Sequence, residues 1–237
     1  MYTYKDRIKL SETDKRRNWT LPAIIDAMQN CVMFQLEDLG IGPDVLDQQN
    51  KALVVTSWQV KIFRLPTLFQ QITVGTQVYG YKSATGLRHC MIWDEQNQLC
   101  VASHSLGAFI DIHTGRPLKT SPEEWEICDV QPQTPCTSIQ FQEKRIPLPA
   151  DLQMVEEFTV NIHHLDINNH MNNGQYVRIA YNYLPDGFQV NQFRVEYKKP
   201  AALGARVSVR QAQQEGLFCV VFSDQANQTF AAVEFSS

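Results

Sequence analysis

The same pattern occurs twice along this chain of 237 residues, and an internal repeat limits the folds that a sequence can adopt. The segment GLRHCMIWDEQNQLCVASH begins at Gly86, and GLFCVVFSDQANQTFAAVE begins at Gly216. Laid together without gaps, the two share their Gly-Leu start and the pairs Asp94/Asp224, Asn97/Asn227, Gln98/Gln228 and Ala102/Ala232. In each segment apolar runs flank a polar Asp-x-x-Asn-Gln, which predicts a strand, a turn and a second strand.

Two further segments repeat in the same order. VKIFRLP (60–66) parallels RVEYKKP (194–200), and each is a β-rich run stopped by proline, which cannot donate to a sheet ladder. Residues 13–32 parallel residues 165–184, each with an Asp-led polar loop followed by apolar residues at helical spacing. Each copy is therefore expected to be α+β, with one helix packed against an antiparallel sheet.

The segment between the copies has its own composition. Residues 116–150 hold six of the eleven prolines and no glycine, which is typical of a semi-rigid connection. The sequence predicts an N-terminal domain over 1–115, this connecting segment, and a C-terminal domain over 151–237.

Composition excludes several classes of function. The net charge of −4 argues against broad binding to nucleic acid or to an anionic membrane. No stretch approaches the roughly 18 apolar residues of a membrane span, and the first residues, MYTYKDRIKL, lack the apolar core of a signal peptide. The six cysteines are scattered without a Cys-x-x-Cys pair, so reduced and mostly buried thiols are expected. The chain is expected to be cytoplasmic.

The stretch LDINNHMNNG (165–174) carries an unusual density of hydrogen-bonding side chains. Alternate spacing can point Asp166, Asn168 and His170 to one side. A helix starting near Asn172 would add unpaired N–H groups and a positive dipole end, suited to a developing oxyanion. A base, a carbonyl donor and a carboxylate are the parts needed for hydrolysis.

The first copy has diverged at this loop. Arg16 stands where the second copy has Asn168, and Asn18 stands where it has His170, while the leading aspartate persists. The first copy is therefore interpreted as a binding half and the second as a reactive half.

Two non-catalytic interpretations of the loop 165–174 are alternatives to a catalytic role. Asx-rich helix starts are common, so Asp166 and Asn172 could serve only as loop and cap residues. His163, His164, Asp166 and His170 could suggest a metal site, but their spacing fits no standard zinc pattern, and no metal or other cofactor is expected.

Asp-x-Asn-x-His-x-Asn-Asn before a helix, followed by an acidic residue in a later strand, resembles the acyl-acyl carrier protein (acyl-ACP) thioesterases. The resemblance covers nearly the whole length and implies a tandem, or double, hotdog fold. It implies that the substrate is acyl carrier protein with a fatty acyl chain on its phosphopantetheine, and that the products are free fatty acid and carrier protein. It also implies a catalytic set of Asp166, Asn168, His170 and Glu196.

From the resemblance we expect Asn168 to polarise the thioester carbonyl, and Glu196 and His170 to activate water. Asp166 would position the loop or act as nucleophile. Many plant members have a cysteine directly after the glutamate, whereas Tyr197 stands here, which favours attack by water or a carboxylate over a cysteine route.

Other expectations remain open from the residues alone. Glu196 shares a strand face with Arg194 and Lys198 that could be solvated, and the first-copy face is apolar, so either strand parity flips or the proline alignment slips by one. The basic residues on predicted adjacent strands form either a charged sheet edge or a dock for an acidic carrier protein; they are Arg194, Lys198, Lys199, Arg206 and Arg210. Apolar residues of the first helix form core or line an acyl tunnel; they are Ile24, Ile25, Met28, Met33 and Phe34.

Three alternatives to an acyl-ACP hydrolase stay open. They are an acyl-CoA thioesterase with the same site, a non-catalytic acyl-chain binding module and, less favoured, a hydratase or dehydratase. Acyl chain length and oligomeric state, including a possible homodimer, are not readable from the sequence.

Overall fold

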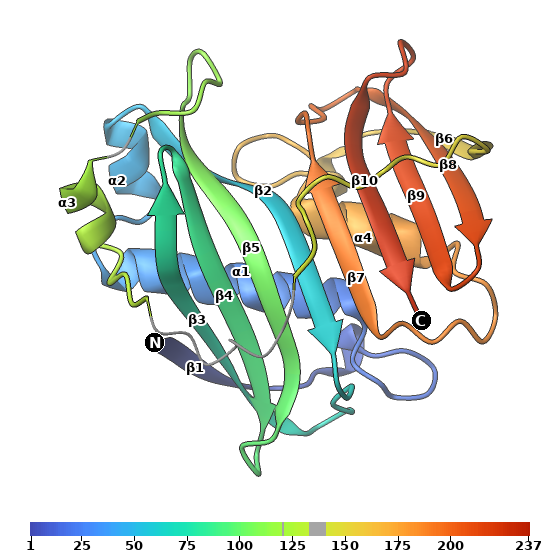
Figure 1. The fold of residues 1–237 in the computed structure, drawn as a ribbon, viewed down its shortest axis with the longest axis horizontal. Helices are drawn as coiled ribbons and strands as arrows, with labels where there is room; N and C mark the ends of the chain where they lie inside the picture. The colour runs from blue at the N-terminus through green and yellow to red at the C-terminus, as the bar shows by residue number, and fades with distance from the viewer. Residues whose placement is uncertain (120, 133–140) are drawn as a thin grey trace. The chain divides into compact units, whose positions relative to one another are not determined.

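The chain forms two compact units, Met1–Phe141 and Gln142–Ser237, in a computed structural model that describes residues 1–119, 121–132 and 141–237 (Figure 1). The elements of unit 1 are β1 (Tyr2–Arg7), η1 (Leu10–Glu12), α1 (Leu21–Asp38), α2 (Pro43–Gln48), β2 (Lys51–Ile62), β3 (Gln71–Lys82), β4 (Thr85–Asp94), β5 (Leu99–Asp111) and α3 (Pro122–Glu126). Those of unit 2 are β6 (Gln153–Thr159), η2 (Ile162–His164), α4 (Asn173–Tyr181), β7 (Gln192–Tyr197), β8 (Arg206–Gln214), β9 (Leu217–Ser223) and β10 (Thr229–Ser236).

The two units have the same strand order. In unit 1 the neighbours run β1-β3-β4-β5-β2, and in unit 2 they run β6-β8-β9-β10-β7. The pairs within each unit are antiparallel, and a helix follows the first strand of each. This arrangement confirms the predicted tandem α+β fold.

Each sheet is covered on one face by a helix (Figure 1). Helix α1 packs on β3 and buries an apolar stripe at helical spacing that includes Ile24, Met28 and Cys31. Helix α4 is half as long, packs on β10 and buries Tyr176 and Val177. Met33 and Phe34 lie outside the buried stripe of α1, so they do not form its core.

The structure decides the alignment question raised by the two proline-terminated runs. The backbone N–H of Trp19 donates to Pro66 O at 2.8 Å, and the N–H of Met171 donates to Ala201 O at 2.8 Å. Pro66 therefore corresponds to Ala201 rather than to Pro200, and the alignment slips by one residue.

The corrected register makes Glu196 the equivalent of Lys61. Lys61 pairs with Ala102 in the unit 1 sheet, and Glu196 pairs with Ala232 in the unit 2 sheet. The apolar faces then agree, because Trp58, Val60 and Ile62 match Phe193, Val195 and Tyr197.

Parts of the segment 116–150 belong to the cores of the units. Trp125 of α3 and Cys128 pack with Leu46, Val78 and Phe109 in unit 1. Ile146 packs with Cys219, Val221 and Ala232 in unit 2.

The cysteines and the helices bear on two further expectations. The five cysteines within the described residues are free and buried, and Cys136 lies outside those residues. None of the helices in the described part of the chain is both long and apolar enough to cross a membrane.

Candidate active site

The loop 165–171 is a tight turn held by its own aspartate. Asp166 N donates to His170 O at 2.8 Å, and Asn169 N donates back to Asp166 O at 3.1 Å. Oδ1 of Asp166 accepts the backbone N–H groups of Asn168 at 2.8 Å and of His170 at 3.3 Å. Asn169 adopts the left-handed conformation, with φ 57°, which asparagine tolerates better than most residues.

The first copy has the same turn with other side chains. Oδ1 of Asp14 accepts the N–H groups of Arg16 and Asn18, each at 2.8 Å. Arg17 takes the left-handed position, with φ 67°. The backbone of the loop is thus duplicated, and the chemistry of its side chains is not.

The same turn closes the two repeated hairpins. Oδ1 of Asp94 accepts the N–H groups of Gln96 and Gln98, and Oδ1 of Asp224 accepts those of Ala226 and Gln228, at 2.8–2.9 Å. Asn97 and Asn227 hold the left-handed positions. Since three other aspartates make these contacts, they are the contacts of a turn-forming residue at Asp166 too.

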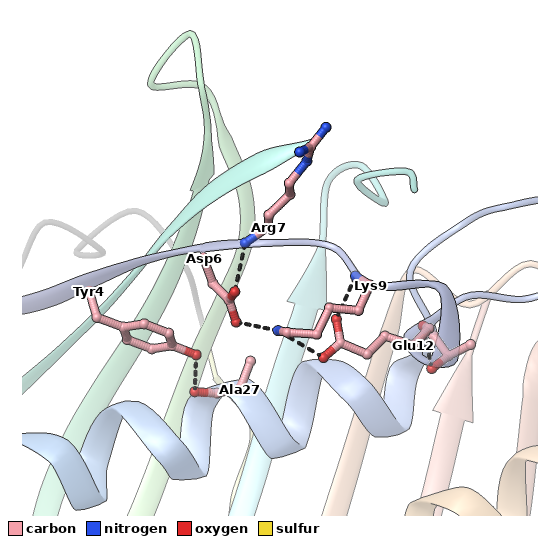
Figure 2. Close-up of polar contacts among 7 residues, drawn as sticks. Tyr4, Asp6, Arg7, Lys9, Glu12 and Ala27 are labelled. Carbon is pink, nitrogen blue, oxygen red and sulfur yellow. Dashed lines mark hydrogen bonds and ion pairs between the residues drawn. The ribbon is translucent and has the colours of Figure 1, made fainter. Parts of the chain in front are cut away.

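The 3-10 turn before each loop fixes where the loop begins. In unit 1, Lys9 Nζ pairs with Asp6 Oδ2 at 2.7 Å, and Lys9 N donates to Glu12 Oε2 at 3.0 Å (Figure 2). Tyr4 Oη donates to Ala27 O at 3.2 Å and joins β1 to α1 (Figure 2).

In unit 2 the place of Glu12 is taken by His164. Its Nδ1 accepts the backbone N–H of Asn161 at 3.0 Å. Burial and the neighbouring His163 lower the pKa of His164, which keeps the ring neutral and able to accept. Within the described residues no group of three or more His, Cys, Asp or Glu side chains could hold a metal ion.

The loop leads directly into α4. Asn172 is the N-cap of this helix, and its Oδ1 accepts the N–H of Gly174 at 2.8 Å. That N–H is therefore already satisfied. Asn168 is exposed and His170 is half-buried, with the backbone of His170 bridged to Ala202.

Glu196 lies in β7 with different neighbours. Its side chain is buried, its Oε2 accepts the N–H of Ile146 at 3.1 Å, and Lys198 Nζ lies 3.5 Å from the same oxygen. The next residue, Tyr197, donates from Oη to Asn173 O at 3.0 Å and so points to the face that carries α4. Because successive side chains of a strand point to opposite faces, Glu196 points away from α4.

The structure thus places Asp166, Asn168 and His170 in one turn and gives Glu196 a separate environment. On the strand face of Glu196, Arg194 is buried as well, whereas Lys198 at the end of that face is exposed. Arg194, with 6% of its surface exposed, pairs with Glu234 at 2.7 Å and donates to Glu143 O at 3.2 Å.

The expectation that the basic residues sit on adjacent strands is wrong. Strands β10 and β9 lie between β7, which carries Arg194, and β8, which carries Arg206 and Arg210. Lys199, just after β7, pairs with Asp224 at 3.0 Å. The prediction failed because the hairpin of β9 and β10 lies between β7 and β8 in the sheet.

Unit 1 contains a cavity of about 30 Å³ between α1, the sheet and the segment after β5. Most of the lining is apolar and comes from Val32, Leu36, Leu53, Val55, Trp58, Val78, Phe109 and Trp125. Gly86 permits the close approach of Trp125, because a Cβ at that position would lie 2.5 Å from the indole. The charged group of the lining is the guanidinium of Arg88.

Comparisons with known proteins agree with this architecture. The family model of the acyl-ACP thioesterase N-terminal domain matches residues 1–128, and the model of the C-terminal domain matches residues 149–235. No match was found among curated protein sequences.

Two solved structures share the fold over their full lengths. An acyl-ACP thioesterase from Bacteroides thetaiotaomicron superposes with a TM-score of 0.88 at 20% identity, covering 99% of this chain and 96% of the other. The 12:0-ACP thioesterase from Umbellularia californica gives a TM-score of 0.82 at 18% identity, covering 100% and 97%. Two repeated α+β units in one chain, matched by the two domain models over most of its length, confirm the double hotdog and show that the chain belongs to the acyl-ACP thioesterase family.

Proposed function

We propose that unit 2 carries the hydrolytic chemistry of this acyl-ACP thioesterase and that unit 1 holds the acyl chain. As a member of its family the chain is a thioester hydrolase acting on fatty acyl-ACP. The observation that carries the assignment to unit 2 is the contrast between the two loops. Both units keep the aspartate-held turn, and only the second displays an amide and an imidazole at the positions of Asn168 and His170.

In this proposal His170 is the general base and Asn168 is the carbonyl donor. The imidazole takes a proton from water as the water oxygen attacks the thioester carbon, and the Asn168 amide donates to the carbonyl oxygen as it becomes negative. Collapse of the tetrahedral intermediate breaks the carbon–sulfur bond, and the pantetheine sulfur takes the proton from His170. A positioned base contributes about 10²–10⁴-fold, and an oxyanion donor adds to that.

Asp166 is assigned a positioning role. Its Oδ1 holds the N–H groups of both reactive residues, and Asp14 holds the same groups in a loop that lacks the reactive side chains. An aspartate that fixes the turn sets the distance between Asn168 and His170 and leaves the proton transfer to the imidazole.

Glu196 has no chemical step in this scheme. Its catalytic role rests on the family resemblance, whereas its contacts with Ile146 and Lys198 support a role in holding the segment before β6 against the sheet. A Glu196→Gln variant separates the two roles, because it keeps the shape of the side chain and removes its charge.

The acyl chain is assigned to unit 1 because the apolar cavity of that unit has room for the end of such a chain, and the carrier protein is the donor of the chain. We also infer a cytoplasmic location, supported by the five free cysteines of the described residues. Whether two copies of the chain associate is addressed by measuring the mass of the protein in solution.

The test is a hydrolysis panel across acyl lengths on carrier protein and on CoA, with the wild type and His170→Ala. We expect the wild type to prefer carrier-linked substrate and the variant to lose activity while its thermal unfolding stays unchanged. Equal rates on CoA would favour an acyl-CoA thioesterase. Tight binding of acyl carrier without turnover by the wild type would favour a binding module.

A further inference from the structure

The lining of the unit 1 cavity includes a buried cation, Arg88, whose hydrogen-bond partners among the described side chains are all neutral. Arg88 lies on β4 with 9% of its surface exposed. Its Nη1 donates to Gln35 Oε1 at 2.5 Å and to Thr76 Oγ1 at 2.8 Å, and both of these partners are neutral. Among the side chains that the structure describes, no carboxylate pairs with Arg88. A buried charge without a counter-ion is costly, so such an arrangement calls for an explanation.

The guanidinium has further donors to offer. A guanidinium carries five N–H groups, and Nη1 supplies two of them, so the N–H groups of Nε and Nη2 remain. Arg88 is one of the residues that line the cavity. The side chain that carries these remaining donors therefore borders a space that a ligand group can occupy.

Two indole groups of the cavity lining add to this set of donors. Trp58 and Trp125 are 0% and 3% exposed, and the Nε1 atom of each is buried without a hydrogen-bond partner among the described residues. An indole N–H can only donate. Buried polar groups without partners are rare and often mark a place where water or a ligand is bound.

The lining of the cavity therefore combines apolar walls with three side chains that each carry a donor unpaired among the described residues. Its volume of about 30 Å³ is room for roughly two water-sized groups, far less than a whole fatty chain. A methyl end would displace water from this space and offer the donors nothing in return. An oxygen-bearing end would accept from them, and a carboxylate would also supply the missing negative charge.

We propose that this cavity receives the distal end of an acyl chain that terminates in an oxygen-bearing group, and that Arg88 determines the preference for such chains over plain alkyl chains of equal length. This inference rests on the proposed placement of the acyl chain in unit 1. The class of substrate is thus an ω-oxygenated acyl group, with an ω-carboxylate bound more tightly than an ω-hydroxyl.

The experiment measures binding directly, because binding is independent of the hydrolytic step. Three pantetheine thioethers of equal chain length, with methyl, hydroxyl and carboxylate ends, cannot be hydrolysed and are titrated into the full-length protein by calorimetry. For the wild type we expect the dissociation constant of the carboxylate-ended probe to be at least about tenfold below that of the methyl-ended probe. The hydroxyl-ended probe should lie between them.

Arg88→Met removes the charge and keeps the length of the side chain. We expect this variant to abolish or reverse the preference for the carboxylate-ended probe over the methyl-ended probe, because an apolar side chain then replaces the guanidinium in the cavity lining. Arg116→Met is the matched control, since Arg116 is an exposed arginine of the same unit, and it should leave the order of the three probes unchanged. Trp125→Phe keeps an aromatic side chain and removes the indole N–H, so it should reduce the preference by a few-fold and serves as the second variant if Arg88→Met does not fold.

Several results would overturn the inference. They are equal or tighter binding of the methyl-ended probe by the wild type, a preference that persists in Arg88→Met and in Trp125→Phe, or no binding of any probe. Such results leave the hydrolytic assignment intact if His170→Ala still loses turnover. Loss of that assignment with the binding order preserved would instead show that the acyl end group is read in unit 1 while the chemistry lies elsewhere.

Discussion

The loops at 13–19 and 165–171 share one backbone and differ in the side chains that they display. In both, the leading aspartate accepts two backbone N–H groups, and the fourth residue of the turn is left-handed. Their other side chains differ, and at the two positions assigned to the chemistry the first loop has Arg16 and Asn18 where the second has Asn168 and His170. The comparison teaches that the shared aspartate belongs to the fold and that the substituted positions are where function can be sought.

The largest expected effect comes from making the second loop chemically like the first. His170→Asn should lower kcat/KM for acyl-ACP by about 10²–10⁴-fold, because the base is lost while the turn is kept. Asn18→His is the reciprocal control and should change hydrolysis by less than about twofold. Steady-state kinetics and thermal unfolding of both variants check this; undiminished hydrolysis by a folded His170→Asn would remove the imidazole from the mechanism.

Replacing the shared aspartates tests whether they stabilise the turn in both units. Asp14→Ala and Asp166→Ala should each lower the free energy of unfolding by about 1–2 kcal/mol, because two backbone N–H groups lose their acceptor. Asn retains an acceptor oxygen, so Asp166→Asn should keep hydrolysis within about tenfold of wild type. A hundredfold loss in Asp166→Asn, with Asp14→Asn unaffected, would show that the Asp166 carboxylate takes part in the chemistry.

Glu196 and Lys61 occupy equivalent strand positions, one buried and one exposed. Glu196→Ala should lower the free energy of unfolding by about 1 kcal/mol because Ile146 N loses its acceptor, and Lys61→Ala should change it by less than about 0.5 kcal/mol. Glu196→Gln should hydrolyse acyl-ACP at a rate within about threefold of wild type. If the glutamine variant instead loses catalysis at unchanged stability, the role implied by the family resemblance is correct.

The smallest expected effect is on the pH dependence of stability, and it concerns His104 and its equivalent in unit 2. Burial lowers the pKa of His104 to about 4, whereas its equivalent in unit 2, Glu234, pairs with Arg194. The unfolded chain binds this proton with a pKa near 6.5, so the contribution of neutral His104 is complete above that pH and is lost as pH falls toward 4.

Wild type should therefore lose about 1 kcal/mol relative to His104→Gln between pH 7 and pH 5.5. Denaturant unfolding at a series of pH values measures the difference. Parallel curves for the two proteins would mean that His104 is protonated as readily in the folded chain as in the unfolded one.

The repeat, the hairpins and the α+β class could be predicted because they depend on local pattern. Apolar runs around Asp-x-x-Asn-Gln fixed the hairpins at Asp94 and Asp224, and helical spacing located α1 and α4. These features need only neighbouring residues.

What failed depended on contacts between distant segments. The alignment of the two proline-terminated segments was wrong by one residue because the backbone oxygen of Ala201, rather than that of Pro200, accepts the hydrogen bond from the loop 165–171. Nothing in the neighbouring sequence distinguishes Ala201 from Pro200 as the acceptor. Glu196 was open to interpretation as a solvated residue because its cover, Ile146, lies 50 positions away in sequence. The turn-forming role of Asp166 could have been found from sequence, since Asp94 and Asp224, like Asp166, are each followed by an asparagine three positions later.

The aspartate-held turn has a consequence for how such a chain can change. Since the carboxylate and the backbone close the turn by themselves, the side chains of its third and fifth residues are not needed to hold the turn. After a duplication, these side chains could be substituted in one copy while the other copy kept the original function. The same substitutions could be made by design at residues 16–18, because the turn already accommodates two different sets of side chains.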